Sequence, residues 1–128
     1  MPQITIDFDT VKNIGLSLPD VEVGTAYGAP ALRLRGKLMA CLPTHRSAEP
    51  NSLAVRIEFD KRSVLIASVP NTYYLKEHYR NHPVVLVRMS RIGLDELRNL
   101  LKMSWQFVNA EARSAGSGRR RSGRSTQK

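Results

Sequence analysis

The chain has 128 residues, of which 41% are hydrophobic and 24% charged, and its formal net charge is +9. This length fits one domain with one core. A lone cysteine, Cys41, excludes an internal disulfide, and no apolar run approaches the roughly 20 residues that cross a bilayer. The first ten residues also lack the basic and apolar regions of a secretory signal. We therefore expect a cytoplasmic protein without membrane insertion, and we favour a monomer.

The first predicted element is a short helix that Asp7 or Asp9 caps and that ends near Leu18, because Pro19 cannot continue it. Between Tyr27 and Glu58 the pattern changes to strands.

In the first of these strands, Leu32 and Leu34 alternate with Arg33 and Arg35, which is typical of a half-buried antiparallel strand. Gly36 and Lys37 follow as a hairpin turn. The remaining predicted elements are strands at Leu38–Leu42, Leu53–Phe59 and Val84–Met89, a short helix capped by Asp60, and a helix with apolar positions from Leu94 to Val108. This order predicts an α+β domain with a mainly antiparallel sheet and helices packed on one face.

The composition changes after Asn109, where serine, glycine, alanine and arginine replace the large apolar residues. Such a segment cannot bury enough surface to offset its ordering entropy. We therefore predict a domain over residues 1–112 and a disordered basic tail over residues 113–128. Six of the nine net positive charges belong to this tail, which contains no acid.

Motifs for catalysis are absent, including GxSxG, HExxH, CxxC and the glycine-rich nucleotide loops, so we expect no enzyme and no cofactor. Two pairs spaced by four residues, Cys41 with His45 and His78 with His82, could suggest a metal. Neither has a second ligand pair, so we predict no metal, a buried Cys41, and a solvated or anion-contacting loop around His78.

The basic residues favour binding to nucleic acid without preference for one sequence, since the contacts would be with phosphates. Arg33, Arg35 and Lys37 share one hairpin, and the tail resembles the flexible arms that bind polyanions by counterion release. The candidate contacts are Arg33, Arg35, Lys37, Arg56, Lys76, Arg88, Arg119, Arg120 and Arg121. We thus expect a non-enzymatic protein that binds DNA or another polyanion with little sequence preference. Outward arginines that only solvate the sheet, and a tail that is solubilising or membrane-seeking, remain open.

The alternative function is a protein-interaction or small-ligand module. Four tyrosines, Tyr27, Tyr73, Tyr74 and Tyr79, could form an exposed patch, and clustered tyrosines suit interfaces.

The stretch from Leu18 to Ala40 contains a Leu-Pro pair, an acidic Val-Glu, a Tyr-Gly-x-Pro turn and a Gly-Lys hairpin. It resembles the leading motif of the MmcQ/YjbR family. The same order continues through Pro70, Tyr73-Tyr74, His82–Val87, Leu94–Leu97 and Ser104-Trp105, so the resemblance spans residues 8 to about 110.

This resemblance implies a compact α+β fold of the double-winged kind, commonly described as DNA-binding. It supplies no catalytic residues. Two features depart from the family: many members open with tryptophan the strand that here begins at Val84, and the arginine-rich tail lies outside the shared domain. Any binding by the tail would therefore be a property of this chain.

Overall fold

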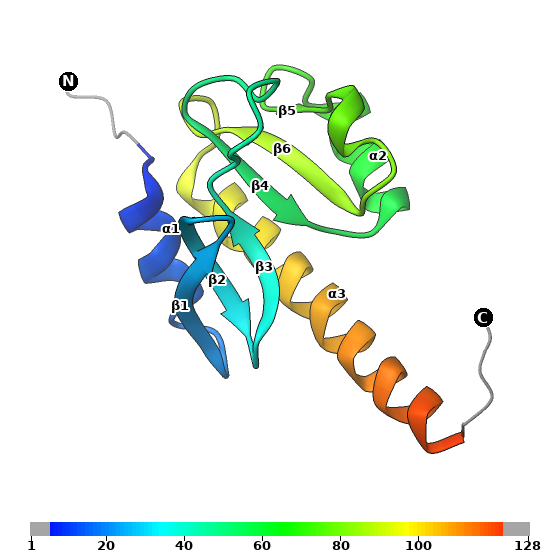
Figure 1. Ribbon diagram of the computed structural model, residues 1–128. Helices are drawn as coiled ribbons and strands as arrows, with labels where there is room; N and C mark the ends of the chain where they lie inside the picture. The colour runs from blue at the N-terminus through cyan, green and yellow to red at the C-terminus, as the bar shows by residue number, and fades with distance from the viewer. Residues whose placement is uncertain (1–5, 122–128) are drawn as a thin grey trace.

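The computed structural model describes residues 6–121, and it describes side chains as far as Glu111. In this part of the chain, six strands form one antiparallel sheet in the order β1-β2-β3-β4-β6-β5 (Figure 1). The strands are β1 Val21–Ala26, β2 Ala29–Leu34, β3 Lys37–Cys41, β4 Ser52–Arg56, β5 Tyr73–Tyr74 and β6 Val84–Arg88. The helices are α1 Phe8–Gly15, α2 Phe59–Ser68, α3 Leu94–Arg121 and the short 3₁₀ helix η1 Glu77–Tyr79.

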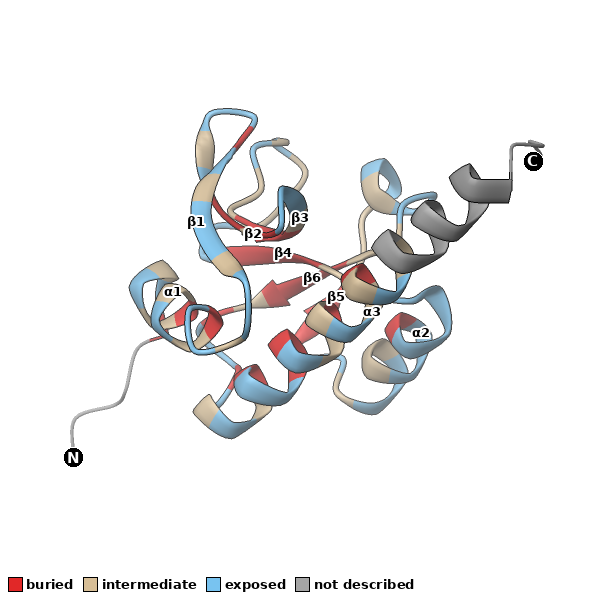
Figure 2. Ribbon diagram, turned by 90° about the horizontal axis from the view of Figure 1, so that it is seen from below, coloured by how far each residue is buried: buried red, intermediate tan, exposed pale blue. Residues whose placement is uncertain are grey.

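The three α-helices pack on one face of the sheet, which confirms the predicted α+β class (Figures 1 and 2). The alternation of side chains along the strands explains why apolar residues face the helices. Leu53 and Val55 of β4 and Val85 and Val87 of β6 are fully buried in the helix-side core, in one cluster with apolar side chains of α3. The main core therefore lies between the sheet and the helices.

The opposite face of the sheet is covered by loops, and we call it the loop-covered face. Its strands contribute mostly small buried side chains, namely Ala31, Cys41 and Ala54, together with Tyr74 and Leu86. Ala48 and Tyr79, from the connections on either side of β4 and β6, pack against them. Small residues here let the two connections approach the sheet closely. The predicted burial of Cys41 is confirmed.

Helix α1 begins as predicted but ends earlier. The Asp7 carboxylate accepts a hydrogen bond from the backbone N–H of Thr10 at 3.1 Å, so Asp7 is the cap. The helix closes at Gly15 rather than near Leu18. A Cβ built on Gly15 would lie 2.4 Å from Leu32 Cδ1, so glycine allows the helix to contact β2. The N–H groups of Ser17 and Leu18 then bond to carbonyls three residues back.

Two strands are absent from the sequence prediction. Strand β1 is mostly exposed, with Gly24 at its centre, and its strand character comes from antiparallel pairing with β2. Strand β5 has two residues and exists through its pairing with β6. In β1 the alternation Val21-Glu22-Val23 ends at Gly24, and β5 is too short to show any alternation.

The backbone of α3 is one helix from Leu94 to Arg121, so it crosses the domain boundary predicted near residue 112. Residues 122–128 and the side chains beyond Glu111 lie outside the described part of the chain. The disorder predicted for residues 113–128 therefore stays a prediction. No helix in the described part is both long and apolar enough to cross a membrane.

Both amino-terminal hairpins close through two-residue turns whose central residues have positive φ. In the β1–β2 turn these are Tyr27 (54°) and Gly28 (79°), and in the β2–β3 turn they are Arg35 (47°) and Gly36 (85°). This is the pattern of a type I′ turn, which matches the twist of the flanking strands. The second turn was predicted one residue too late, because Lys37 already pairs with Leu34 in the sheet.

The β1–β2 turn generates a prediction about stability. Asn-Gly is the preferred type I′ pair, whereas a bulky side chain at positive φ costs free energy. We expect Tyr27→Asn to raise the free energy of unfolding by about 1 kcal/mol, measured by chemical denaturation. Gly28→Ala is the matched control. A Cβ at Gly28 meets no atom within 4 Å, so its expected loss of about 1 kcal/mol reports backbone conformation alone. Equal stability of all three proteins would contradict this reasoning.

Candidate functional site

The hairpin arginines occupy different surroundings, although the sequence predicts a shared face. Arg33 lies in β2 and donates from Nε and Nη2 to the Thr25 carbonyl (3.1 and 2.9 Å) and from Nη1 to the Gly36 carbonyl (2.9 Å). Arg35 lies in the turn and bonds to Asp20 (2.5 Å) and to Asn109 on α3. The prediction that Arg33 and Arg35 share one face is therefore wrong, because Arg35 lies in the turn, outside the alternation of side chains along the strand.

Two further candidate cations form bidentate ion pairs. Arg56 contacts both carboxylate oxygens of Glu111 at 3.0 Å and lies over the Phe107 ring. Arg88 contacts both oxygens of Glu49 at 2.8 and 2.9 Å. These four arginines thus connect parts of the fold, and each already donates to at least two acceptor atoms.

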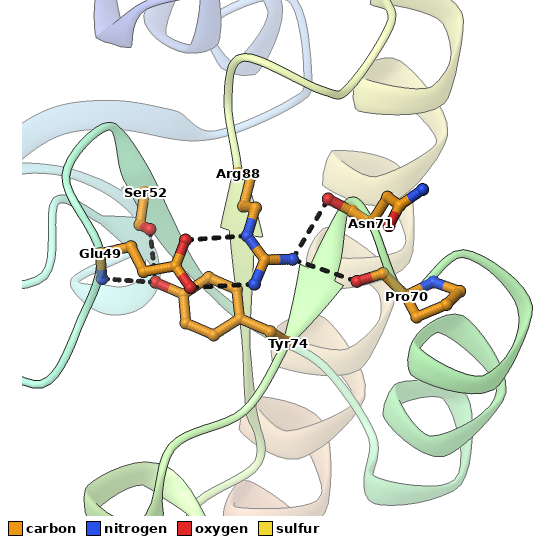
Figure 3. A network of polar contacts seen from close by, with 6 residues as sticks. All are labelled: Glu49, Ser52, Pro70, Asn71, Tyr74 and Arg88. Carbon is orange, nitrogen blue, oxygen red and sulfur yellow. Dashed lines mark hydrogen bonds and ion pairs between the residues drawn. The ribbon is translucent and has the colours of Figure 1, made fainter.

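Arg88 is the centre of a polar network on the loop-covered face (Figure 3). Its Nη1 donates to the carbonyls of Pro70 and Asn71 at 3.0 and 3.2 Å, and its guanidinium lies 4.4 Å from the Tyr74 ring centroid. The Tyr74 hydroxyl accepts the Glu49 backbone N–H at 2.7 Å and lies 2.5 Å from Ser52 Oγ. Hydrogen bonding to Arg88 holds the pKa of Glu49 below its ordinary value of 4.5.

The predicted tyrosine patch does not form. Adjacent strand residues point to opposite faces, so Tyr73 is buried in the helix-side core and Tyr74 on the loop-covered face. The Tyr73 hydroxyl donates to Glu96 at 2.8 Å, and burial followed by this bond raises the Tyr73 pKa. Tyr79 is half-buried. Tyr27, with 85% of its surface exposed, is the member of the four that a partner could contact freely.

His45 and His78 come together, which neither spacing-based pair predicted. Their rings stack with centroids 3.7 Å apart and planes 12° apart, and the Tyr79 ring meets both edge-on. Partial burial, then His78, then Arg46 lower the pKa of His45 from 6.5, which favours its neutral form near neutral pH. Parallel rings direct their in-plane nitrogens side by side, so this stack does not converge on one ion. Within the described residues, no group of three or more His, Cys, Asp or Glu side chains could hold a metal.

The histidine stack joins residues 43–51, which connect β3 to β4, with residues 75–82, which precede β6. We call the surface of these two connections the loop cluster. Arg46 is exposed on it, and Lys76 is half-buried with its Nζ 5.8 Å from the Tyr74 ring. Arg46 was not among the predicted contacts, because the sequence shows only a polar loop there. Lys37 is exposed but starts β3, so it lies at the other end of that strand. The side chains of Arg119, Arg120 and Arg121 lie outside the described part.

A groove of about 700 Å³ separates the end of α1 from the start of α3. Its lining mixes polar amides with charges of both signs: Asn13, Ile14, Ser17, Leu18, Asp95, Arg98, Asn99 and Lys102. Arg98 and Asp95 pair with each other at 3.1 Å. The groove therefore presents no concentrated charge to a ligand.

A family model described as YjbR matches residues 16–107 of the chain. Among solved structures, the fold is similar to that of Deinococcus radiodurans protein DR2400, which carries a DUF419 domain. The TM-score is 0.68 at 14% identity, over 88% of this chain and 85% of that chain. No curated protein matches the sequence. At this identity the solved structure supports the fold and assigns no activity.

The Arg88–Glu49 pair generates a prediction about pH. A carboxylate whose pKa is lower in the folded protein stabilises the fold above its ordinary pKa, and this contribution is lost as pH falls through the folded value. We expect Glu49→Gln to lower the free energy of unfolding near neutral pH, and the difference from wild type to shrink below pH 4.5. Glu77→Gln is the control, because the Glu77–Arg80 pair is exposed and contributes little. Denaturation across a pH series measures both; a pH-independent difference for Glu49→Gln would contradict the mechanism.

Proposed function

The chain belongs to the YjbR family, and we propose a function from its charges, because family membership assigns a fold but no reaction. The proposed function is that of a non-enzymatic protein that binds nucleic acid through phosphate contacts with little sequence preference. Duplex DNA is the first partner to test. The same chemistry extends to other polyanions.

The observation that carries this proposal is the segregation of charge along the chain. Residues 113–128 hold six cationic residues and no acid, whereas residues 1–112 have a net charge of only +3. Cations without neighbouring acids bind phosphates by releasing condensed counterions, which requires no base contact. The segment therefore supplies affinity without sequence information.

The folded domain contributes fewer contacts than its arginine count suggests. Arg35, Arg56 and Arg88 already pair with carboxylates, so transferring them to phosphates would break bonds that hold the fold. Arg46 and Lys76 of the loop cluster support a second contact region, because neither forms an ion pair with a described acid and the histidine stack holds their connections together.

We base the proposed low sequence preference on the way the described helices pack. A helix that reads bases inserts exposed side chains into the major groove. The apolar side of α3 is buried against the sheet through Leu97, Leu101 and Val108, and α1 has only eight residues. We therefore expect neither α1 nor the described part of α3 to insert base-reading side chains into a groove.

The absence of an enzyme activity is part of the proposal. The polar groups of Figure 3 bond to one another, as expected of a network that holds a loop in place. A catalytic centre instead directs polar groups at a substrate position.

The test is a salt series of fluorescence-anisotropy binding with labelled duplex DNA. We expect the full-length variant R119Q/R120Q/R121Q to bind more weakly and to reduce the slope of log K against log salt by about 2 to 3, because each lost phosphate contact removes about 0.9.

A matched control, K61Q/R98Q/K102Q, removes the same charge from exposed positions on α2 and α3. We expect it to retain most of the slope. Equal losses of salt slope in both variants would mean that overall net charge, and not residues 119–121, controls DNA binding. Salt-independent binding by wild type would refute the proposal.

A further inference from the structure

Tyr27 is an aromatic residue that the fold exposes rather than buries. Its side chain is 85% exposed at the tip of the β1–β2 hairpin, while Tyr73 and Tyr74 are buried. The other exposed large hydrophobic residues of the described chain are scattered: Leu16, Val23, Phe59 and Val64. A protein interface of even small size needs a contiguous area of several hundred Å² on each partner, and these residues belong to separate elements, with only Phe59 and Val64 sharing one, α2.

The backbone conformation at Tyr27 is one that tyrosine rarely adopts. At φ 54° a tyrosine is disfavoured, and asparagine or glycine would fit the turn better. Arg35 adopts a similar conformation in the next turn, but its side chain bonds to Asp20 and Asn109, whereas the Tyr27 ring is exposed. A residue in a disfavoured conformation motivates a functional hypothesis. The ring serves no core, because it is exposed, so packing does not account for it.

Two basic residues come from segments that contact this hairpin. The tip lies at the same end of the sheet as the connection that leaves β3, where the Leu42 N–H donates to the Pro30 carbonyl at 3.2 Å (Figures 1 and 2). Arg46 is exposed on that connection. Arg33 donates to the Thr25 carbonyl, two residues before the tip, and to the Gly36 carbonyl in the β2–β3 turn, which uses three of its five N–H donors. Two of its donors remain, and Glu22 is its register partner in β1.

We infer that Tyr27 is a stacking platform for an unpaired nucleobase, with Arg46 and Arg33 contacting the phosphates beside it. An exposed ring next to cations is how proteins hold single strands without reading their sequence. A duplex does not offer the face of a base to such a ring, because its bases already stack on one another. This inference rests on the proposed function and adds a preference for single strands at one place in the domain.

The experiment compares the full-length wild type, Tyr27→Phe and Tyr27→Asn by fluorescence anisotropy. The probes are a labelled oligothymidine, an abasic strand with the same number of phosphates, and a duplex. We expect Tyr27→Asn to bind oligothymidine about tenfold more weakly, as for the loss of one stacked base. Tyr27→Phe keeps an aromatic face and should bind as wild type does.

The abasic strand separates stacking from charge. Tyr27→Asn and wild type should bind it equally and with the same salt slope, because its phosphates remain and its bases do not. Tyr27→Asn suits the turn, so its melting temperature should not fall, and weaker binding cannot then be assigned to unfolding.

The outcomes distinguish the two proposals. If wild type binds all three probes with a salt slope but Tyr27→Asn binds oligothymidine equally well, the stacking inference is overturned and the proposed function stands. If wild type binds none of the probes, both fail. Equal weakening of Tyr27→Asn on oligothymidine and on the abasic strand would also overturn stacking, because the effect would not depend on a base.

Discussion

The bidentate pair between Arg88 and Glu49 fixes the connection between β3 and β4 onto the loop-covered face, and much of the candidate surface depends on it. Arg88 comes from β6 and also binds the carbonyls of Pro70 and Asn71, so one guanidinium ties together three separate parts of the chain. Tyr74 completes the arrangement by receiving the Glu49 N–H. With that connection held, His45 stacks on His78 and Arg46 is presented on the surface.

The arginines of this protein have two roles, and the bonds that each side chain makes distinguish them. Inside the domain, Arg33, Arg62 and Arg88 bond to backbone carbonyls of segments that lack regular ladders. Gly36, His82 and Pro70, which supply these carbonyls, are exposed, so the bonds hold the segments in position and do not satisfy buried groups. Beyond residue 112, arginines occur without any acid. Counting both groups together overstates the charge that the domain offers to a polyanion.

The β1–β2 hairpin shows a conflict between local preference and the residue present. Gly28 suits its positive φ, whereas Tyr27 does not, and the ring gains no burial in return. Natural sequences tend to break a local rule where function requires it. The contrast with Tyr73 and Tyr74 is instructive, since those two rings contribute to the two cores and are held by hydrogen bonds.

The sequence by itself determined the α+β class, the family resemblance, an aspartate cap at Asp7 or Asp9 and the main apolar strands and helix, because hydrophobic periodicity and capping are local properties. Tertiary structure decided which tyrosine is exposed, where each arginine is bonded and that His45 meets His78. Tyr73 and Tyr74 are neighbours in the chain, yet pairing with β6 sends them to opposite faces. Partners such as Arg88 and Glu49 are 39 residues apart, so no local pattern could pair them.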